Sequence, residues 1–522
     1  MPRHPTRSPR CPEYPHPSSA AGSLAAVVPG GSTPGRAGAM PSRMPVSELC
    51  FASATRLAGL LRSKEISVEE LMRAHLSRIE QVNPSFNAIV TLDPERGLEG
   101  ARAADARQAR GEPLGLLHGL PIAHKDLVMT AGIRTTFGST LFRGFVPARD
   151  DFVVERLKAA GAITIGKTNT PEFGAGSQTY NEVFGETLNP YDTSKTCGGS
   201  SGGAAVALAT GMLPIADGSD MGGSLRNPGS FCNVVGLRPS PGRVPVYPTQ
   251  LAWSGLAVLG PMARTVEDAA LLLSAMAGPD PRSPISIREP GERFAAPLGR
   301  DFQGVRIAWS RDLGGLPVDG RVTAALEAKL PVFEALGCET EEAEPDFAEA
   351  DEIFKVLRAW TFALGFAAAG ESAMKHLKDT VVWNLEQGRA LTAEQIGRAE
   401  IKRTRLYHAM RQFMEDYEFL VLPVSQVPPF DVRERYITEI EGVKMETYVD
   451  WMKSCYYITV TGHPAISVPC GFTPEGLPVG LQIVGRHQDD WGVLQLAYAF
   501  EQAVGAWKRR PPGLTSPECT IN

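Results

Sequence analysis

The chain has 522 residues, a formal net charge of −6 and 43% hydrophobic residues, a composition typical of a soluble globular enzyme that can bury a large core. Its acidic balance offers no basic face for nucleic acid or an anionic membrane, so we expect neither partner. The eight cysteines form no C-x-x-C pair, which predicts no zinc site and no disulfide scaffold and suits a cytoplasmic protein.

The first 43 residues differ in composition from the rest of the chain. They are rich in Pro, Ser, Gly and Arg, and their only apolar run, 24–28, is too short for a signal peptide or a membrane span. We predict a disordered tail. An upstream start codon, with Met40 or Met44 as the working start, explains the composition equally well.

The next part of the chain predicts helices that lead into a short strand. Apolar residues recur at helical spacing over 54–61 and 68–82, with Ser67 as the N-cap of the second helix. Residues 87–92 form a predicted strand, and a helix is expected over 98–110. A second strand, over 120–122, leads into Lys125.

Lys125 is a candidate base at the end of that strand. A lysine accepts a proton only when it is neutral, and burial favours the neutral form because it removes the charge from water. His124 is its neighbour in sequence. Since neighbouring side chains of a strand point to opposite faces, we expect His124 to pack or to form hydrogen bonds rather than to react.

Residues 161–168, GAITIGKT, match the phosphate-binding pattern G-x-x-x-x-G-K-[ST]. That pattern requires a strand before its first glycine and a loop between the two glycines. Here a helix is expected over 152–160, and AITI itself is the strand. We therefore expect no nucleotide site.

The small residues at 174–177 are typical either of tight turns or of a pocket wall that leaves room for a bulky acyl group.

Two serine clusters framed by glycine lie close together, GGSSGG at 198–203 and DMGGS at 220–224. Glycine permits positive φ and lets backbone N–H groups approach a bound atom. The pattern therefore predicts a nucleophile built together with an oxyanion hole. GGSSGG also matches the elbow of α/β-hydrolases, but that elbow follows a strand, whereas 189–195 reads as a loop.

The order of these motifs resembles that of the amidase signature family. GLPIAHKDL at 119–127, GGSSGG and DMGGS are separated by the family's usual intervals, because the lysine precedes the first serine by 75 residues and that serine precedes the last by 24. The resemblance implies a triad of Ser224 as nucleophile, Ser200 as bridging serine after a cis Gly199–Ser200 bond, and Lys125 as base.

The same resemblance assigns roles to the residues around the triad. It implies an oxyanion hole made of the N–H groups of Met221, Gly222, Gly223 and Ser224. It places Gly174, Ala175, Gly176 and Ser177 on the acyl side of the pocket. It makes Ser201, Asp220 and Arg226 supporting residues that do not react.

The rest of the chain alternates between helices and strands. Strands are predicted over 305–309, 419–422, 465–468 and 479–484, and helices over 321–336 and 490–504. This alternation implies an α/β fold with a large mixed β-sheet sandwiched between helix layers. The resemblance implies a single domain over 44–510, with a mostly helical variable region at about 345–417 and a tail at 511–522.

The resemblance implies a hydrolase that cleaves the carbon–nitrogen bond of small linear amides, with aryl amides and carbamates as candidate substrates, and without a metal or another cofactor. A homodimer is compatible with this. The main alternative is the glutaminase subunit of a tRNA-dependent transamidase. Two differences argue against it. The chain has Asp-Met-Gly-Gly at 220–223, where that subgroup usually has Asp-Thr-Gly-Gly, and it has AWSGLAV at 252–258 in place of that subgroup's usual Ser-Ser-Leu-Asp-Gln region. An esterase of the α/β-hydrolase type is a further alternative.

Overall fold

The computed structural model describes residues 45–367 and 371–514. The predicted tail at 1–43 lies outside these residues, as do residues 515–522 of the C-terminal one. Within the described part, no helix combines the length and the apolar composition needed to cross a membrane.

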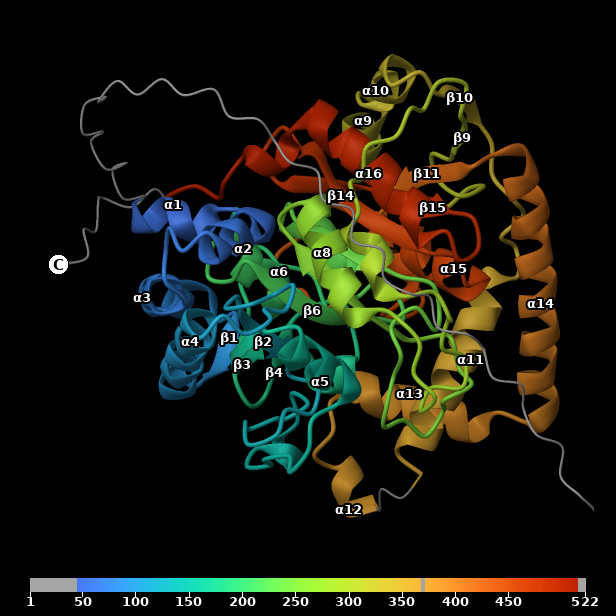
Figure 1. The fold of residues 1–522 in the computed structure, drawn as a ribbon. Helices are drawn as coiled ribbons and strands as arrows, with labels where there is room; N and C mark the ends of the chain where they lie inside the picture. The colour runs from blue at the N-terminus through green and yellow to red at the C-terminus, as the bar shows by residue number, and fades with distance from the viewer. Residues whose placement is uncertain (1–44, 368–370, 515–522) are drawn as a thin grey trace, which may run out of the picture. The chain divides into compact units, whose positions relative to one another are not determined.

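The core is an eight-stranded sheet with the order β10-β9-β11-β15-β14-β7-β8-β6 (Figure 1). β9 pairs in parallel with β10 and β11, and the other pairs are antiparallel, so the sheet is mixed. Its strands are β6 (Ile215–Asp220), β7 (Val235–Arg238), β8 (Val258–Ala263), β9 (Arg306–Trp309), β10 (Glu339–Glu342), β11 (Phe419–Pro423), β14 (Ala465–Phe472) and β15 (Pro478–Gly485).

Both faces of this sheet are covered. Every residue of β11 and β15 is buried, and successive side chains of a strand point to opposite faces. Helix α16 (Asp490–Val504) packs on β14 and β15, and α8 (Val266–Met276), which contacts α16, packs on β7 and β8 (Figure 1). The other face of β15 carries α7 (Arg226–Phe231), because a Cβ at Gly480 would meet Ser230 of α7 whereas one at Gly485 would meet Val493 of α16. The predicted α/β fold with a mixed sheet between helices is confirmed.

A smaller sheet positions Lys125. Its order is β1 (Ile89–Leu92), β3 (Ile163–Thr168), β2 (Pro121–Lys125), with β2 parallel and β1 antiparallel to β3. All five residues of β2 are buried, and β2 lies against β6 of the large sheet. The lysine is therefore the last residue of a strand that is enclosed by both sheets.

The remaining helices and short strands complete the described part of the chain. The helices are α1 (Val46–Phe51), α2 (Ala54–Arg62), α3 (Val68–Phe86), α4 (Pro94–Ala109), α5 (Phe152–Ala159), α6 (Gly202–Ala209), α7 (Arg226–Phe231), α9 (Gly320–Glu327), α10 (Leu330–Ala335), α11 (Ala350–Gly365), α12 (Glu371–Met374), α13 (Asp379–Ala390), α14 (Ala393–Asp416) and α15 (Lys453–Thr461). The short strands are β4 (Tyr180–Asn181), β5 (Gly185–Glu186), β12 (Glu439–Ile440) and β13 (Val443–Lys444). Single 3₁₀ turns are η1 (Thr140–Phe142), η2 (Glu172–Gly174), η3 (Gly291–Ala295), η4 (Asp450–Met452) and η5 (Ala506–Lys508).

Capping residues explain where several helices begin. The Ser67 side chain accepts a hydrogen bond from the Glu70 N–H, and the Glu70 side chain accepts one from the Ser67 N–H, a complete capping box at the start of α3. Helix α4 begins earlier than the predicted 98 because Asp93 caps it and Pro94 occupies its first position.

The prediction of one continuous helix over 321–336 is wrong. The helix expected over 321–336 is divided into α9 and α10. Pro331 lies in the first turn of α10, and proline has no N–H to continue a helix and disfavours helical φ and ψ for the residue before it. The break at 328–329 is the consequence.

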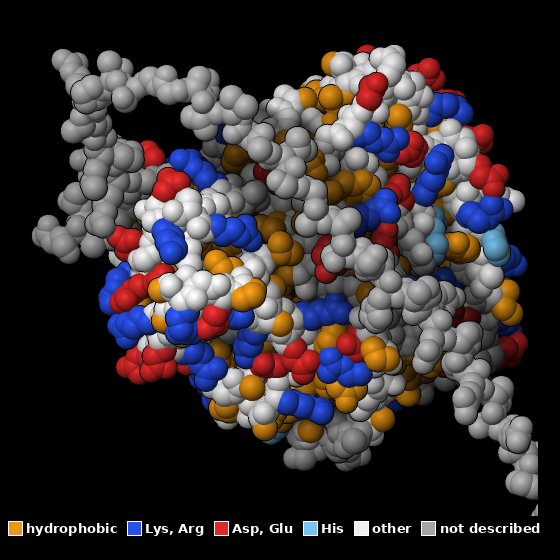
Figure 2. All heavy atoms as spheres, viewed as in Figure 1, with side chains coloured by type: hydrophobic (Ala, Val, Ile, Leu, Met, Phe, Trp, Pro, Cys, Tyr) orange, Lys and Arg blue, Asp and Glu red, His pale blue; other side chains and the backbone are white. Residues whose placement is uncertain are grey.

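Helices α11, α13 and α14 form a group beside the large sheet (Figure 1). α11 packs against α13, α14 and α15, and its buried residues share a hydrophobic cluster with α14 and α15, formed by Phe354, Leu357, Leu406, Met410, Tyr456 and Ile458. On the face seen in Figure 2, acidic and basic side chains are interspersed.

Candidate active site

The Lys125 ammonium lies among three serine hydroxyls. Its Nζ is 2.8 Å from the Oγ of Ser200, 2.8 Å from the Oγ of Ser201 and 3.0 Å from the Oγ of Ser219, and it donates a hydrogen bond to each. The lysine side chain is completely buried. The sequence motifs predict no role for Ser219. This residue lies on β6, whose sequence IADGSD is too polar to be recognised as a strand.

This environment shifts the proton affinity of the lysine. Burial lowers the pKa of Lys125 to about 7, although the carboxylates of Asp220 and Asp217 act in the opposite direction. Desolvation disfavours the charged form of an amine. A large fraction of the lysine is therefore neutral near pH 7, and a neutral amine can accept a proton.

The loop that carries Ser200 precedes α6. The Gly199–Ser200 peptide bond is cis, as the resemblance implied. The Gly199 N–H donates to the Asn227 side chain at 3.1 Å, which fixes the loop to the start of α7. Ser201 is the N-cap of α6, and its N–H donates to the Ser224 carbonyl at 3.2 Å. The two serine clusters are thus directly connected.

The turn after β6 is organised by the carboxylate of Asp220. Its oxygens accept hydrogen bonds from the Gly223 N–H at 3.0 Å and from the Leu225 N–H at 3.2 Å. The Gly223 N–H is therefore engaged inside the turn, which differs from the expectation of four donors to one oxyanion. Within the described part of the chain, the N–H groups of Met221, Gly222 and Ser224 donate to no protein atom.

Two buried arginines hold Asp220. The Arg226 Nη2 lies 2.8 Å from one carboxylate oxygen and its Nε lies 3.0 Å from the other, while Arg238 donates to the Asp220 carbonyl at 2.6 Å. Burial alone would raise the pKa of Asp220, but these guanidinium groups outweigh it and hold the pKa well below its usual range. Arg226 also donates to Gln482 of β15 at 2.6 Å, so it ties the turn to the large sheet.

The Ser224 side chain is 8% exposed. Its Oγ forms no hydrogen bond with a described residue, so the hydroxyls of Ser200 and Ser224 are not hydrogen-bonded to each other. Hydrogen bonds between reacting groups are often absent before substrate binds and form in the complex. The structure thus places Ser224 on the turn beside the Lys125–Ser200 pair with its hydroxyl unengaged.

The segment 174–177 borders Ser200. Gly174 has φ of +71°, and a Cβ built there would lie 3.5 Å from the Ser200 Oγ and 3.0 Å from Leu127. Gly176 has φ of +112°. Both values lie in the left-handed region that favours glycine. Ala175 is buried in a cluster with α11 and α13, and the Ser177 hydroxyl donates to the Met452 thioether.

His124 contacts none of the three hydroxyls around Lys125. Its Nδ1 lies 2.9 Å from Asp217 and its Nε2 lies 3.0 Å from the Thr164 hydroxyl, so both ring nitrogens are used. The expectation of a hydrogen-bonding role is confirmed. Most of the segment 161–168, which matches the phosphate-binding pattern, is the buried strand β3, and its Lys167 donates to Thr130 at 2.9 Å and to the Val128 carbonyl. No phosphate loop is formed there.

The α/β-hydrolase elbow lacks its strand. Among the described residues before Ser200, only isolated bridges at Leu188–Thr196 and Lys195–Asp431 occur in 188–196. The downstream His463 is buried and contacts Thr461 of α15. The geometry therefore does not support this alternative.

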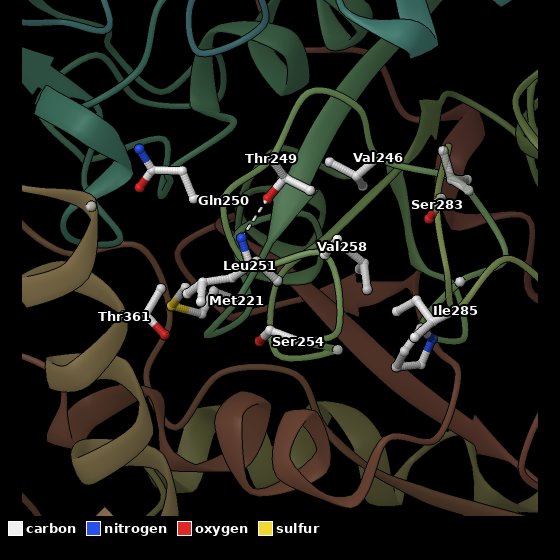
Figure 3. A pocket seen from close by; sticks show the side chains of 17 residues that line it. Met221, Val246, Thr249, Gln250, Leu251, Ser254, Val258, Ser283, Ile285 and Thr361 are labelled. Atoms are coloured by element: carbon white, nitrogen blue, oxygen red, sulfur yellow. Dashed lines mark hydrogen bonds between the residues drawn. The ribbon is translucent and has the colours of Figure 1, made fainter. Parts of the chain in front are cut away.

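An apolar cavity of about 290 Å³ opens next to the turn. It is bounded by the Met221 side chain, by Thr361 and Gly365 of α11, and by the segment 244–258, which contributes Val246, Leu251 and Val258 (Figure 3). Trp253, in the same segment, is 80% exposed. The cavity therefore connects the turn that bears Ser224 to the helical group of α11.

Known proteins are similar to this chain in sequence. The profile of the family described as "Amidase" matches residues 70–494. An acylamidase of Rhodococcus erythropolis is 38% identical over 477 residues, covering 90% of this chain and 98% of that protein. The A-type subunit of a glutamyl-tRNA(Gln) amidotransferase from Moorella thermoacetica is 38% identical over 488 residues, with 89% and 99% covered.

Solved structures of amidases are similar to this chain in fold. A bacterial aryl acylamidase of the amidase signature family superposes with a TM-score of 0.83 at 28% identity, covering 89% of this chain and 99% of that one. A peptide amidase from Stenotrophomonas maltophilia gives a TM-score of 0.75 at 27% identity, also with 89% and 99% covered. The chain belongs to the amidase signature family and is an amidohydrolase.

Proposed function

We propose that this amidohydrolase cleaves linear amides through an acyl-enzyme on Ser224, with Lys125 as the base and Ser200 as the proton relay. The observation that carries the proposal is the completely buried Lys125 Nζ at 2.8 Å from the Ser200 Oγ. A serine hydroxyl is a weak nucleophile until a base takes its proton, and a second hydroxyl can connect it to a base that does not reach it directly.

In the proposed reaction, neutral Lys125 accepts the Ser200 proton while Ser200 accepts the Ser224 proton. The Ser224 oxygen attacks the amide carbonyl and forms a tetrahedral intermediate. The proton then returns through the same relay to the amine nitrogen, the carbon–nitrogen bond breaks, and the acyl group remains on Ser224. Water repeats the sequence and releases the acid.

The negative charge of the intermediate would be bound by the N–H groups of Met221, Gly222 and Ser224, which are the donors of the turn that no described residue uses. Donors fixed before the charge develops are effective, and loss of one typically costs about 10²- to 10³-fold in kcat. Asp220 makes the turn rigid, because its carboxylate accepts hydrogen bonds both from the Gly223 N–H within the turn and from the Arg226 side chain.

We further propose aryl amides and aryl carbamates as substrates and a cytoplasmic location. The likeness to an acylamidase and an aryl acylamidase supports the aryl class. The cavity beside Met221, lined by aliphatic side chains, suits an aryl ring.

A second candidate function is the glutaminase activity of a transamidase subunit, which the sequence identity of 36–38% to several such subunits supports. The two functions differ in whether the chain works without partners. The test is release of p-nitroaniline from a panel of acyl p-nitroanilides, together with phenol release from one aryl carbamate.

We expect turnover by the purified parent chain and none by its Ser224→Ala variant. Anilide or carbamate turnover at equal rates in both would contradict the Ser224 assignment. No turnover by either, with glutaminase activity only beside transamidase partners, would establish the second candidate in place of the first.

A further inference from the structure

Arg358 of α11 is a buried cation whose partners are all neutral. Its side chain is 6% exposed. Nε donates to the Asn384 side-chain oxygen at 3.2 Å, Nη2 donates to the Tyr448 hydroxyl at 2.8 Å, and Nη1 contacts the Met221 thioether at 3.4 Å. Among the described residues, no carboxylate forms an ion pair with it.

Three other buried arginines are paired with carboxylates, whereas the buried Arg264 donates to the backbone carbonyls of Ala52, Leu208 and Leu213. Arg226 and Arg238 share Asp220, and Arg243 pairs with Asp490 at 2.9 Å and with Glu289 at 2.6 Å. A buried charge without a counter-charge is costly, and proteins normally pair it. The surroundings of Arg358 are instead aromatic, with its guanidinium 4.8 Å from the centre of the Phe362 ring.

Arg358 lies beside the proposed site. The Met221 whose thioether it contacts belongs to the turn that carries Ser224 and also lines the apolar cavity, where Thr361 is its neighbour from α11 (Figure 3). Tyr448, whose hydroxyl accepts the hydrogen bond from Nη2, lies next to the segment 174–177. Its ring is 4.0 Å from the position that a Cβ at Gly176 would occupy.

The contact with Met221 is the weak one of the three. A thioether is a poor acceptor of hydrogen bonds, and an unbranched methionine side chain changes rotamer easily. An oxygen anion placed there would replace it with a charge-assisted hydrogen bond, to which the planar guanidinium is well suited.

We propose that Arg358 binds a carboxylate on the acyl part of the substrate, so that the enzyme selects amides whose acyl group is anionic. This inference rests on the proposed function, because the acyl side of the pocket is defined by it. Tyr448 and Asn384 hold the guanidinium in place, and Met221 moves aside when the carboxylate enters.

The test measures binding without turnover. Anilides of malonic, succinic and glutaric acid place a free carboxylate one to three methylenes from the amide, and the matching primary amides have nearly the same shape without the charge. Calorimetry on the Ser224→Ala variant gives the Kd of each pair. Because a hydrogen bond to a charged group is worth about 1.5–3 kcal/mol, at least one carboxylate should bind about 10- to 100-fold more tightly than its amide.

Adding Arg358→Met should remove this preference, whereas Arg358→Lys, which keeps the charge, should retain part of it. Arg405→Met on α14, which breaks an exposed ion pair with Glu349, is the control and should leave the ratio unchanged. Equal affinities for acid and amide in Ser224→Ala, or a ratio unaffected by Arg358→Met, would overturn the proposal. Since no step requires turnover, a selective Ser224→Ala protein from an inactive parent would refute the proposed function and would leave a carboxylate site at Arg358 without its assignment to an acyl group.

Discussion

Lys125 is the residue whose protonation controls the proposed chemistry. It is enclosed by the ends of two sheets, and three hydroxyls are the only hydrogen-bond partners of its Nζ among the described residues. Neutral acceptors of this kind do not stabilise the ammonium as a carboxylate in contact would. The surroundings of Lys125 therefore favour its neutral form near pH 7, which the proposed role as a base requires.

The pH profile tests this property. Because only neutral Lys125 accepts a proton, kcat/KM for a neutral anilide should rise as the pH increases through about 7 and level off above about 8. The fall on the acid side should be about tenfold per pH unit. A profile that is flat from about pH 5.5 to about pH 9 would contradict a lysine base.

A substitution of Asp217 tests whether Lys125 is the group that titrates in this pH profile. Its carboxylate raises the pKa of Lys125 and lies 2.9 Å from His124, away from the reacting hydroxyls. Removal of the charge in Asp217→Asn should lower the pKa of Lys125, so the acid limb of the profile should move to lower pH. A limb that moves to higher pH, or stays in place, would show that another group titrates.

At the scale of elements, the turn between β6 and α7 depends on the buried pair of Asp220 and Arg226. Removing one member of a buried pair costs up to about 3–5 kcal/mol when the other charge is left without a partner. In Arg226→Met the Asp220 carboxylate would keep only one ion pair, the longer contact with Arg238 at 3.3 Å. The variant should therefore reduce the free energy of unfolding by up to that amount, measured by denaturant titration, and should abolish most activity.

The matched control is Arg405→Met, whose side chain is 62% exposed in its ion pair with Glu349. Exposed pairs contribute less than about 1 kcal/mol. Similar losses in the two variants would mean that Asp220 does not depend on Arg226 for its charge.

The elements also show how far the sequence could be interpreted. Periodicity located α16 and the strands β11, β14 and β15 within two residues at most ends, because these segments are continuously apolar or clearly amphipathic. It missed β6, whose two aspartates are buried and whose Ser219 is half-buried at the site. The motifs placed Lys125, Ser200 and Ser224 in one region. In the structure, Lys125 donates to the Ser200 hydroxyl, and Ser224 is connected to this cluster through its carbonyl, which accepts from the Ser201 N–H.

Other features of the site depend on contacts between distant parts of the chain. Arg358 and Tyr448 are 90 residues apart, and Arg238 reaches Asp220 across 18 residues from another strand. Local patterns in a single sequence carry no information on such pairs. The use of the Gly223 N–H by Asp220 is likewise a detail of turn geometry that the letters DMGGS do not determine.

At the scale of the whole molecule, the region from α2 to α16 contains the two sheets, the residues of the proposed triad and the helical group of α11, α13 and α14. We propose that residues 44–510 form one domain that suffices for activity. Deleting residues 1–43 should then leave kcat/KM within about twofold of the parent, since a Pro- and Ser-rich terminus with few apolar residues adds little packing. A more than tenfold loss in the purified truncated chain would contradict this.

The acyl-enzyme is the most direct test of the account, because its position identifies the nucleophile. Aryl carbamates are suited to this test: attack by a serine expels the phenol and leaves a carbamoyl group that water removes slowly. Intact-mass and peptide mass spectrometry after brief incubation should find one carbamoyl group on Ser224, none in Ser224→Ala, and a much lower rate of modification in Lys125→Met. A carbamoyl group on Ser200, Ser201 or a cysteine, or equal modification of the Ser224→Ala chain, would contradict the account.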